Sequence, residues 1–532
     1  MKIKLFYLVA MLALFAISPL ANAQAPSLGA AGNFALFSSN GAVSNTGISH
    51  ITGDVGTQNG SSTAFANVDG VMHDQDGNSA AANASLLVAY NQLNATIATA
   101  SLAALLGSGQ TLTTGIYNIP ESAALNGALI LDAQGNSDAI FIFKIGGAFS
   151  SAAASQVVLS NGALACNVFW KVEGLVDLAT NTIMKGNVIA NNAAIIINTG
   201  TNIEGRVLST TGAVTIHGST VRLPLGCGST VLTGPTAPSL LSVVCYTLFS
   251  AVGHVVNSGE SFIVGDIGTN FGAVTDFQTA NVTGTIHPIP DASTAQCAAD
   301  LGTIYQYLSA LPVDIELLFP AQFGNDLVLT PHTYLLNGPT VMTNKVTLNA
   351  QGNPDAIFVF KVSSAFSTSS YAEIELINGA QAKNVFWKID GLTLINNNSS
   401  FKGTIVANNG PVHLRTGVVL EGRALTLVGA VGISDVTATV ATDCTLALPD
   451  NHATKQAVTF YPNPFSNTLS VSITEGGNHE LFLYSVTGAQ VLKQTLTQTE
   501  TTMDVNVPAG MYFYKIVGAN GTILTGKLMS VK

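Results

Sequence analysis

The sequence predicts a mainly β protein with two tandem three-faced β-solenoids, a long α-helix packed alongside each, and a small C-terminal β-sandwich. Three observations lead to this fold class. A long stretch of the chain occurs twice without gaps. Within each copy, β segments recur at roughly 18–27 residues per cycle, too long for simple hairpins and suited to solenoid coils. The composition then changes after the second copy.

The repeated stretch runs from Leu131 to Leu208 and again from Leu348 to Leu425. The two stretches align without a shift. Trp170 and Trp387 are separated by the same number of residues as Leu131 and Leu348. A repeat of this length indicates a duplicated domain.

Each copy holds one helix and a series of short strands. Residues 79–106 are rich in Ala and Leu without Gly or Pro, which predicts a long helix, and a shorter helix is expected near residues 291–311. The segments AIFIFKI, NVFWKV, NVIA and RVLS are expected on one face of the first solenoid, and the segments that follow each of them on the next face. Both Trp residues lie in these apolar strands and are expected in the core.

The composition excludes several classes of protein. Charged residues make up only 9% of the 532 residues and the net charge is −11, without a Lys/Arg cluster beyond the first residues. We therefore expect no nucleic-acid partner. The N-terminal segment has two lysines, an apolar run and the sequence Ala21-Asn22-Ala23, which predicts a secretory signal peptide. No other run approaches the ~20 apolar residues of a membrane span.

The chain contains five cysteines, an odd number: Cys166, Cys227, Cys245, Cys297 and Cys444. Cys227 and Cys444 are repeat partners, whereas Cys245 and Cys297 occur only in the second copy and could bridge its N-terminal strand to its helix. Spacing alone leaves the pairing open. No CxxC motif indicates a thiolate metal or redox site.

The boundaries follow from the repeat and from two linkers. We expect a signal peptide at 1–23, the first solenoid at 24–225, a Gly/Pro/Thr linker at 226–242, the second solenoid at 243–444, a linker at 445–457 and the sandwich at 458–532.

A catalytic site finds little support in the sequence. The HExxH, GxSxG and GxxxxGK[ST] motifs are absent and the nine histidines are scattered, so we expect no enzyme activity, metal or cofactor. Glu204, which aligns with Glu421, is the candidate general acid or base, but that role requires a second carboxylate nearby. We interpret the repeated Glu and Arg as ion pairs within or between coils, and the repeated Asp residues as turn caps.

One predicted face instead carries small and hydroxyl side chains with almost no charge. Its members are Thr180, Thr182, Thr199, Thr201, Asn202, Ser219 and Thr220, with Thr416 in the second copy. Most solvent-facing strands use Lys, Glu or Arg for solubility. Rows of methyl and hydroxyl groups can order water beside them, a property that suits binding to ice.

The last residues resemble the type IX secretion sorting domain of Bacteroidetes-type bacteria. The matching motifs are Tyr461-Pro462-Asn463-Pro464 and Gly510-Met511-Tyr512-Phe513-Tyr514. The resemblance implies export across the outer membrane by the type IX secretion machinery, with the cargo released or attached to the cell surface.

Both copies resemble the ice-binding protein family of cold-living microbes, through motifs such as LDAQGNSDAIFIFKI and NTGTNIEGRVL. The resemblance implies a discontinuous right-handed β-helix with a helix alongside, and ice binding through the face after the FIF/VFW strands, often with a Thr-Ala/Gly-x-Thr/Asn motif. Residues 199–202 match that motif, whereas residues 416–419 depart from it at the last position and follow His413 and Arg415. The second copy is therefore expected to bind ice more weakly.

Together these observations predict an extracellular ice-binding protein that lowers the freezing point locally or inhibits recrystallisation. The alternative is a cell-surface adhesin that binds glycans or ice, although a glycan groove would need exposed aromatic side chains. The expected partners are the ice surface and the type IX secretion machinery, and we expect a monomer.

Overall fold

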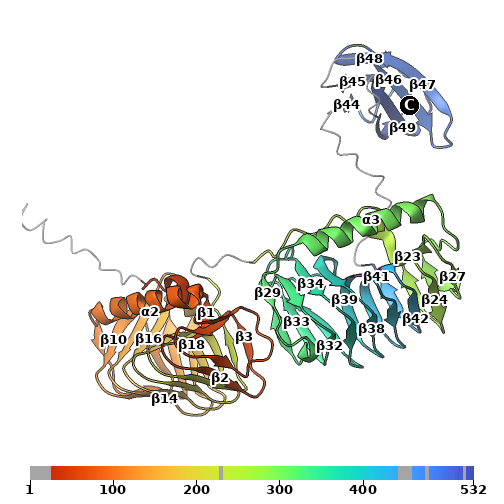
Figure 1. Ribbon diagram of the computed structural model, residues 1–532. Coiled ribbons are helices and arrows are strands. Elements are labelled where there is room, and N and C mark those ends of the chain that lie inside the picture. Colours follow the sequence, from red (N-terminus) through yellow and green to blue (C-terminus); the bar gives the residue numbers. More distant parts are fainter. Residues whose placement is uncertain (1–24, 227–231, 441–457, 474–477, 519–522, 532) are drawn as a thin grey trace, which may run out of the picture. The chain divides into compact units, whose positions relative to one another are not determined.

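The computed structural model describes residues 25–226, 232–440, 458–473, 478–518 and 523–531 (Figure 1). The predicted signal peptide, Cys227 and Cys444 lie outside these ranges. Residues 1–444 form one compact unit, which holds both repeats, and residues 445–532 form a second, which we call the tail.

Each repeat is a parallel β-helix with three faces, as predicted. In the first repeat, the first face has the spatial order β6 (Met72–Asp74), β4 (Asp54–Thr57), β1 (Phe34–Ser38), β20 (Asn202–Ser209), β18 (Ile183–Ala190), β16 (Val168–Val172), β13 (Phe141–Ile145), β10 (Gly115–Ile119) and β7 (Ala100–Ser101). The next face is an eight-stranded sheet, β5 (Ser62–Thr63), β2 (Val43–Thr46), β21 (Val214–His217), β19 (Ile195–Ile197), β17 (Val176–Leu178), β14 (Phe149–Ser151), β11 (Ala123–Asn126) and β8 (Leu105–Gly107). The predicted assignment of segments to these two faces is confirmed.

The third face of the first repeat shares two long strands with the first face. It consists of β9 (Gln110–Leu112), β12 (Ala128–Asp132), β15 (Gln156–Ser160), the first halves of β18 and β20, β22 (Thr220–Arg222) and β3 (His50–Thr52). Ile183 at the start of β18 pairs with β15, whereas Asn187 further along pairs with β16. These long strands therefore turn from one face to the other.

The second repeat has the same plan. Its first face contains β26 (Asp266–Thr269), β23 (Tyr246–Val252), β41 (Val419–Val428), β39 (Ser400–Ala407), β37 (Val385–Ile389), β34 (Phe358–Val362), β31 (Thr333–Leu336) and β29 (Ile315–Glu316). Its seven-stranded sheet contains β27 (Val274–Thr275), β24 (Val255–Ser258), β42 (Val431–Ser434), β40 (Val412–Leu414), β38 (Thr393–Ile395), β35 (Phe366–Thr368) and β32 (Thr340–Met342). Its third face contains β30 (Leu327–Leu329), β33 (Lys345–Asn349), β36 (Glu373–Ile377), β43 (Thr437–Thr439), β25 (Phe262–Val264) and β28 (Val282–Thr283).

The coils do not follow the order of the chain throughout. Strand β1, near the start of the first repeat, pairs with β20 of the last coil on one side and with β4 on the other. In the second repeat β23 lies between β41 and β26 in the same way. The β-helix is therefore discontinuous.

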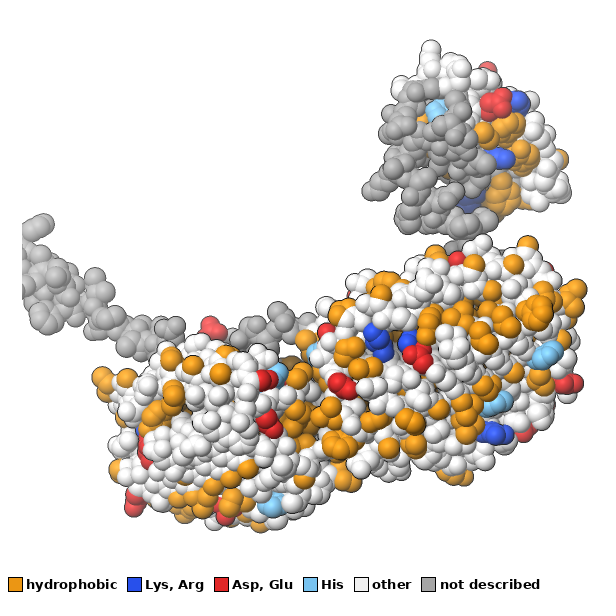
Figure 2. Space-filling view, in the orientation of Figure 1, with side chains coloured by type: hydrophobic (Ala, Val, Ile, Leu, Met, Phe, Trp, Pro, Cys, Tyr) orange, Lys and Arg blue, Asp and Glu red, His pale blue; other side chains and the backbone are white. Residues whose placement is uncertain are grey.

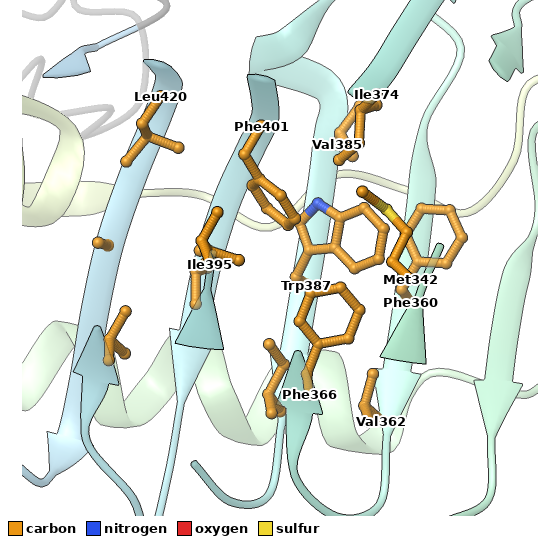
Figure 3. Close-up of a cluster of buried hydrophobic side chains, with 14 of the residues drawn as sticks. Met342, Phe360, Val362, Phe366, Ile374, Val385, Trp387, Ile395, Phe401 and Leu420 are labelled. Atoms are coloured by element: carbon orange, nitrogen blue, oxygen red, sulfur yellow. The ribbon is translucent and has the colours of Figure 1, made fainter. Parts of the chain in front are cut away.

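Stacked aromatic side chains fill the interior. In the first repeat Tyr117, Phe143 and Trp170 occupy paired positions of neighbouring coils, and the rings of Phe143 and Trp170 stack with centroids 4.0 Å apart. In the second repeat Trp387 stacks on Phe360 at the same distance (Figure 3). Both Trp residues are fully buried, as predicted. Each aromatic pair adds about 0.5–1.5 kcal/mol beyond the burial of its area.

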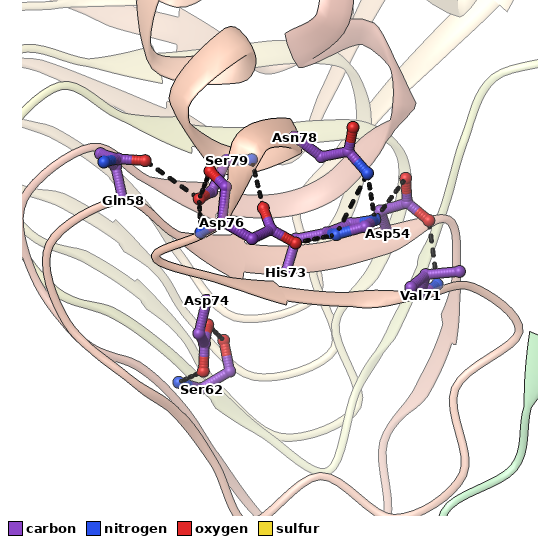
Figure 4. Close-up of polar contacts among 9 residues, drawn as sticks. All are labelled: Asp54, Gln58, Ser62, Val71, His73, Asp74, Asp76, Asn78 and Ser79. Atoms are coloured by element: carbon purple, nitrogen blue, oxygen red, sulfur yellow. Dashed lines mark hydrogen bonds and ion pairs between the residues drawn. The ribbon is translucent and has the colours of Figure 1, made fainter.

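One helix covers the first face of each repeat: α2 (Gly77–Ala95) and α3 (Ala292–Ala310). The N-terminus of α2 is held by a reciprocal cap, because the Asp76 carboxylate accepts from the Ser79 N–H and the Ser79 hydroxyl accepts from the Asp76 N–H (Figure 4). The Nδ1 atom of His73 lies 2.6 Å from the second carboxylate oxygen of Asp76, Oδ2. His287 contacts Asp291 in the same way at the start of α3.

The predicted length of the first helix was wrong. We expected a helix over residues 79–106, but it ends at Ala95, and residues 100–101 and 105–107 form strands β7 and β8. The Lys144 ammonium group donates to the carbonyl oxygens of Asn94 and Thr96, and so satisfies the C-terminal end. Lys361 donates in the same way to the carbonyl oxygens of Ser309 and Leu311 at the end of α3. Both helices have 19 residues, so the prediction of a shorter second helix was also wrong.

The cysteines of the second repeat do not form the bridge that we considered. Cys245 and Cys297 are both free thiols. Cys297 is buried in α3, where desolvation raises its pKa, and it packs as a small apolar side chain. Cys166 of the first repeat is disulfide-bonded.

Hydrogen bonds join the two repeats directly. The carboxylate of Asp69, only 3% exposed, accepts from the Tyr334 hydroxyl at 2.6 Å and from the Thr330 hydroxyl at 2.8 Å. Asn67 exchanges two further bonds with the backbone of Phe319, at 3.0 and 3.1 Å. Burial raises the pKa of Asp69, and the surrounding donors oppose that shift. The linker is therefore not the only connection between the described parts of the two repeats.

The tail is an antiparallel β-sandwich, as predicted. One sheet contains β44 (Val458–Tyr461), β45 (Thr468–Ile473) and β48 (Glu500–Asp504). The other contains β47 (Gln490–Leu496), β46 (His479–Ser485), β49 (Gly510–Gly518) and β50 (Ile523–Ser530). Leu469 and Val471 of the first sheet pack with Leu481, Leu483 and Ile516 of the second.

We predict that Tyr334→Phe destabilises the protein more than Tyr117→Phe at the equivalent position of the first repeat. The Tyr117 hydroxyl donates to the Thr113 carbonyl oxygen, whereas the single proton of the Tyr334 hydroxyl is shared between the Thr330 carbonyl oxygen and Asp69. Only the Tyr334 hydroxyl also contacts Asp69. Because a buried carboxylate then loses a donor, the difference in free energy of unfolding should be about 1–3 kcal/mol. Denaturation of the two full-length variants measures it, and equal losses would contradict a stabilising junction.

Candidate functional site

The outward side chains of the eight-stranded sheet form a continuous row across its coils. Strand pairing aligns them in the order Thr63, Ser44, Thr215, Ile196, Asp177, Ser150, Ala124 and Leu105. In the middle strands of the sheet the residues on either side of the central position point into the core, for example Val214 and Ile216 beside Thr215. The row therefore presents hydroxyl and apolar groups with one charged side chain, Asp177.

The other two faces differ from this sheet, because a helix covers one of them and the other carries ion pairs. The first face packs against α2 through residues such as Phe169 and Leu208, so it is not available to a large surface. The third face carries a row of ion pairs, because Glu204 contacts Lys185 at 2.7 Å and Arg222 at 3.1 Å. Charged side chains are sparse elsewhere on the visible surface of the first repeat (Figure 2).

The ion pairs settle the interpretation of Glu204. Burial would raise the pKa of its carboxyl, but hydrogen bonds from Lys185 and Arg222 more than offset this effect, and the pKa lies below its ordinary value. A carboxylate held in this way is poorly suited to donate a proton. Glu421 contacts Lys402 of the neighbouring coil in the second repeat, so the repeated Glu residues do pair between coils. The repeated Arg is not their partner as predicted, because Arg206 donates to the Gly32 carbonyl oxygen and to the Asn187 amide oxygen.

The corner turns connect the eight-stranded sheet to the third face. Near the end of each turn stands a residue with left-handed backbone, such as Gly200 (φ 77°) after Thr199 and Asn181 (φ 60°) after Thr180. Thr180 and Thr199 are exposed there. The neighbouring turns form a shallow depression lined by Thr46, Gly47, Ile48, Asn198, Thr199, His217 and Gly218.

Three predicted site residues point into the protein instead of outward. Thr182, Thr201 and Ser219 are at most 4% exposed, and with Ser49 and Ser155 they form a buried column of hydroxyls along the corner. Thr182 and Thr201 both donate to the Ala179 carbonyl oxygen, at 2.7 and 3.1 Å. The expectation that all the threonines project from one sheet was therefore wrong, because the residue after each left-handed position turns inward and satisfies the backbone of the turn.

The remaining predicted residues lie on two surfaces. Asn202 and Thr220 are paired neighbours on the third face, Asn202 exposed and Thr220 half-buried. Thr416 is exposed at a corner turn of the second repeat. Val418, at the position of Thr201, is fully buried, whereas Val419, at the position of Asn202, is 46% exposed, so the departure at the last position of the motif does change the third face.

The seven-stranded sheet of the second repeat has a comparable outward row. Strand pairing aligns Thr275, Val256, Gly432, His413, Leu394, Ser367 and Val341. Burial, reinforced by the positive charge of Arg415, lowers the pKa of His413 below its ordinary value. At neutral pH the row is therefore uncharged, and Arg415 lies just beyond it. Since the first repeat carries Asp177 in its own row, charge alone no longer ranks the second repeat as the weaker one.

The sequence pattern missed much of the exposed row. Ser44 and Thr46 come from a strand near the start of the repeat, yet they lie beside Thr215 and His217 of the last coil. Their alternation with buried Val43 and Asn45 was a signal for an outward position. The discontinuous order of the coils hid which residues they would join.

The described residues contain neither a group of three or more His, Cys, Asp or Glu able to hold a metal ion nor a helix long and apolar enough to cross a membrane.

Comparisons with known proteins place these features in context. A family model described as ice-binding-like matches residues 37–222 and 249–439, and one described as a secretion system C-terminal sorting domain matches residues 459–531. Over 193 residues the chain is 40% identical to an ice-binding protein of Nostoc sp. (strain HG1), covering 36% of this chain and 71% of that protein. Over 217 residues it is 30% identical to an ice-binding protein of Flavobacterium frigoris (strain PS1), covering 37% and 76%.

A solved structure covers both repeats. The crystal structure of an ice binding protein from an Antarctic bacterium of the Flavobacteriaceae is 61% identical, with a TM-score of 0.79, and spans 80% of this chain and 100% of that one. Together with the tail, which matches a type IX sorting domain, these similarities support a secreted or cell-surface location.

We predict that Thr201→Val lowers the free energy of unfolding by about 1 kcal/mol, because a buried hydroxyl loses its bond to the Ala179 carbonyl. Thr199→Val, two residues earlier and exposed, should change it by less than about 0.5 kcal/mol. Thermal or chemical denaturation of the two variants provides the comparison. A larger loss for Thr199→Val would show that the two side chains have been assigned to the wrong sides of the turn.

Proposed function

The chain belongs to the ice-binding-like family, and we propose that it binds ice through the outward rows of the eight-stranded and seven-stranded sheets and the corner turns beside them. The observation that carries this proposal is the row itself, in which eight aligned positions of the first repeat hold one charge. By adsorbing to ice, the protein would lower the freezing point locally or inhibit recrystallisation.

The physical basis is the hydration of such a row. Neighbouring coils lie about 4.8 Å apart, so matching side chains form a regular array. Methyl groups and exposed hydroxyls, such as those of Thr215 and Thr199, combine apolar hydration with hydrogen bonding. A charged side chain instead holds its own water tightly. The strand ladder and the corner hydroxyls fix the backbone, so little conformational entropy is lost on adsorption.

Two other functions have less support. An enzyme would need a catalytic group, and Glu204, the candidate, is bound by Lys185 and Arg222 on the third face. An adhesin for glycans would be favoured by aromatic rings gathered on the uncovered sheet. Trp170 and Trp387 are buried, and although Phe271 and Tyr371 are exposed elsewhere, neither outward row contains a Phe, Tyr or Trp side chain. A surface-attached form of the protein that holds a cell to ice remains compatible with the proposal.

We predict that Thr215→Tyr, in the middle of the eight-stranded sheet, reduces freezing-point depression severalfold, because a bulky ring lifts ice off the row. Thr199→Tyr at the corner turn should act in the same direction. Val88→Tyr, at a 53% exposed position of α2 on the covered side of the repeat, is the matched control and should have no effect. Nanolitre osmometry measures the activity, and melting curves check that all three variants are folded.

Asn202→Tyr tests the third face, on which the sequence pattern had placed part of the site. A loss of activity confined to Asn202→Tyr would overturn the proposed sheet in favour of the third face. If all the variants depress the freezing point as much as the parent protein does, then neither surface of the first repeat contributes to ice binding.

We predict that acidification weakens ice binding by the second repeat. Burial lowers the pKa of His413 below its ordinary value, which favours the neutral ring, and protonation at lower pH places a second positive charge beside Arg415. Freezing-point depression should therefore fall as the pH drops through that lowered pKa. His413→Gln, which cannot take up a proton there, should remove this part of the pH dependence. An identical pH profile for the parent and the variant would exclude His413 from the contact surface.

A further inference from the structure

The outer face of the four-stranded sheet in the tail is rich in exposed large apolar side chains. One side of this sheet covers the sandwich core through Leu481, Leu483 and Ile516. On the opposite side Met511, Phe513 and Met529 are 43%, 47% and 47% exposed. Large apolar side chains gathered on one surface of a soluble domain mark interaction sites, because exposing them to water is unfavourable.

These side chains form a continuous patch across three strands. Phe513 of β49 pairs with Tyr484 of β46 on one side and with Lys527 of β50 on the other. In the neighbouring row Met511 pairs with Met529. Directly opposite residues in an antiparallel sheet project to the same side, so their side chains are in reach of one another. We call this surface, together with Phe482, the outer tail face.

All three described lysines of the tail lie on the outer tail face. Lys493 and Lys515 pair with Phe482 from either side, and Lys527 pairs with Phe513. Lys493 contacts Glu480 at 2.8 Å, whereas no described residue offers an acidic partner to Lys515 or Lys527. Figure 2 shows lysine side chains among hydrophobic ones on the visible part of the tail.

The other sheet of the sandwich has the opposite character. Its outward positions carry Tyr461, Ser470, Ser472, Glu500, Thr502 and Asp504, and the Tyr461 hydroxyl donates to Glu500. The two outer surfaces of one small domain thus differ sharply, one being polar and acidic and the other apolar and basic. In the described part of the tail, the two lysines without an acidic partner, Lys515 and Lys527, thus lie beside the apolar patch.

We propose that the outer tail face is the surface with which the tail docks on a protein of the secretion machinery. The partner would present an apolar surface bordered by acidic groups opposite Lys515 and Lys527. Burial of Met511, Phe513 and Met529 would supply the affinity, and the lysines would steer the encounter and fix the orientation. The inference rests on the match to a sorting domain and is independent of ice binding.

The test follows export of the full chain in a bacterium that has a type IX secretion system. The double variant Met511→Ser/Phe513→Ser removes the centre of the apolar patch. Val486→Ser, at a 67% exposed position in the turn between β46 and β47, removes a large apolar side chain elsewhere and is the matched control. We expect severalfold less double variant in the medium and on the cell surface, with accumulation in the periplasm, and parental export of the control.

A second variant guards against loss of folding. Lys527 is exposed and has no acidic partner among the described residues, so Lys527→Glu should leave the sandwich folded. It should also reduce export, because it repels the acidic partner. Parental export of both folded variants would overturn the proposal. Light scattering provides a second way to overturn it. If the parental chain forms a dimer in solution, and the variants abolish the dimer without affecting export, then the face joins two copies of the chain.

Discussion

The parallel stacking of coils is the constraint on which the rest of the structure depends. Once Phe143 and Trp170 stand at paired positions, with ring centroids 4.0 Å apart, every neighbouring residue of their coils is fixed in register. A slip of one residue would exchange the buried and exposed sides of a strand. The same contact recurs between Phe360 and Trp387, at the equivalent strand positions of the second repeat.

The three faces of each repeat have become specialised around this core. The helix covers one face and is held at both ends, by Asp76 at the start and by Lys144 at the end of α2. The ion pairs of Glu204 occupy another face. The remaining sheet carries few charges, and it is the surface proposed to meet ice. Charged residues that are shared by both repeats serve the scaffold.

The junction between the repeats is unusual in its polarity. Asp69 is nearly inaccessible to water and is bound by the side chains of Tyr334 and Thr330 from the other repeat. A buried carboxylate is costly unless its oxygens are satisfied. If the repeats moved apart and Asp69 stayed buried, its carboxylate would lose these donors, which would be unfavourable in free energy. The junction thus favours one arrangement of the two β-helices over a freely jointed pair.

The sequence by itself determined the duplication, the assignment of strands to faces, the buried Trp residues and the sandwich of the tail, because these depend on local periodicity and on a repeat that can be read directly. It overextended the first helix, since the Ala- and Leu-rich composition of residues 96–106 suits both helix and strand, and contacts such as those of Lys144 decide between them. Only the tertiary structure decided which threonines face solvent. Thr199 and Thr201 are two residues apart, but the left-handed turn at Gly200 sends one outward and the other onto the Ala179 carbonyl. Only the tertiary structure placed Ser44 beside Thr215, because that neighbourhood arises from a strand that closes the solenoid out of chain order.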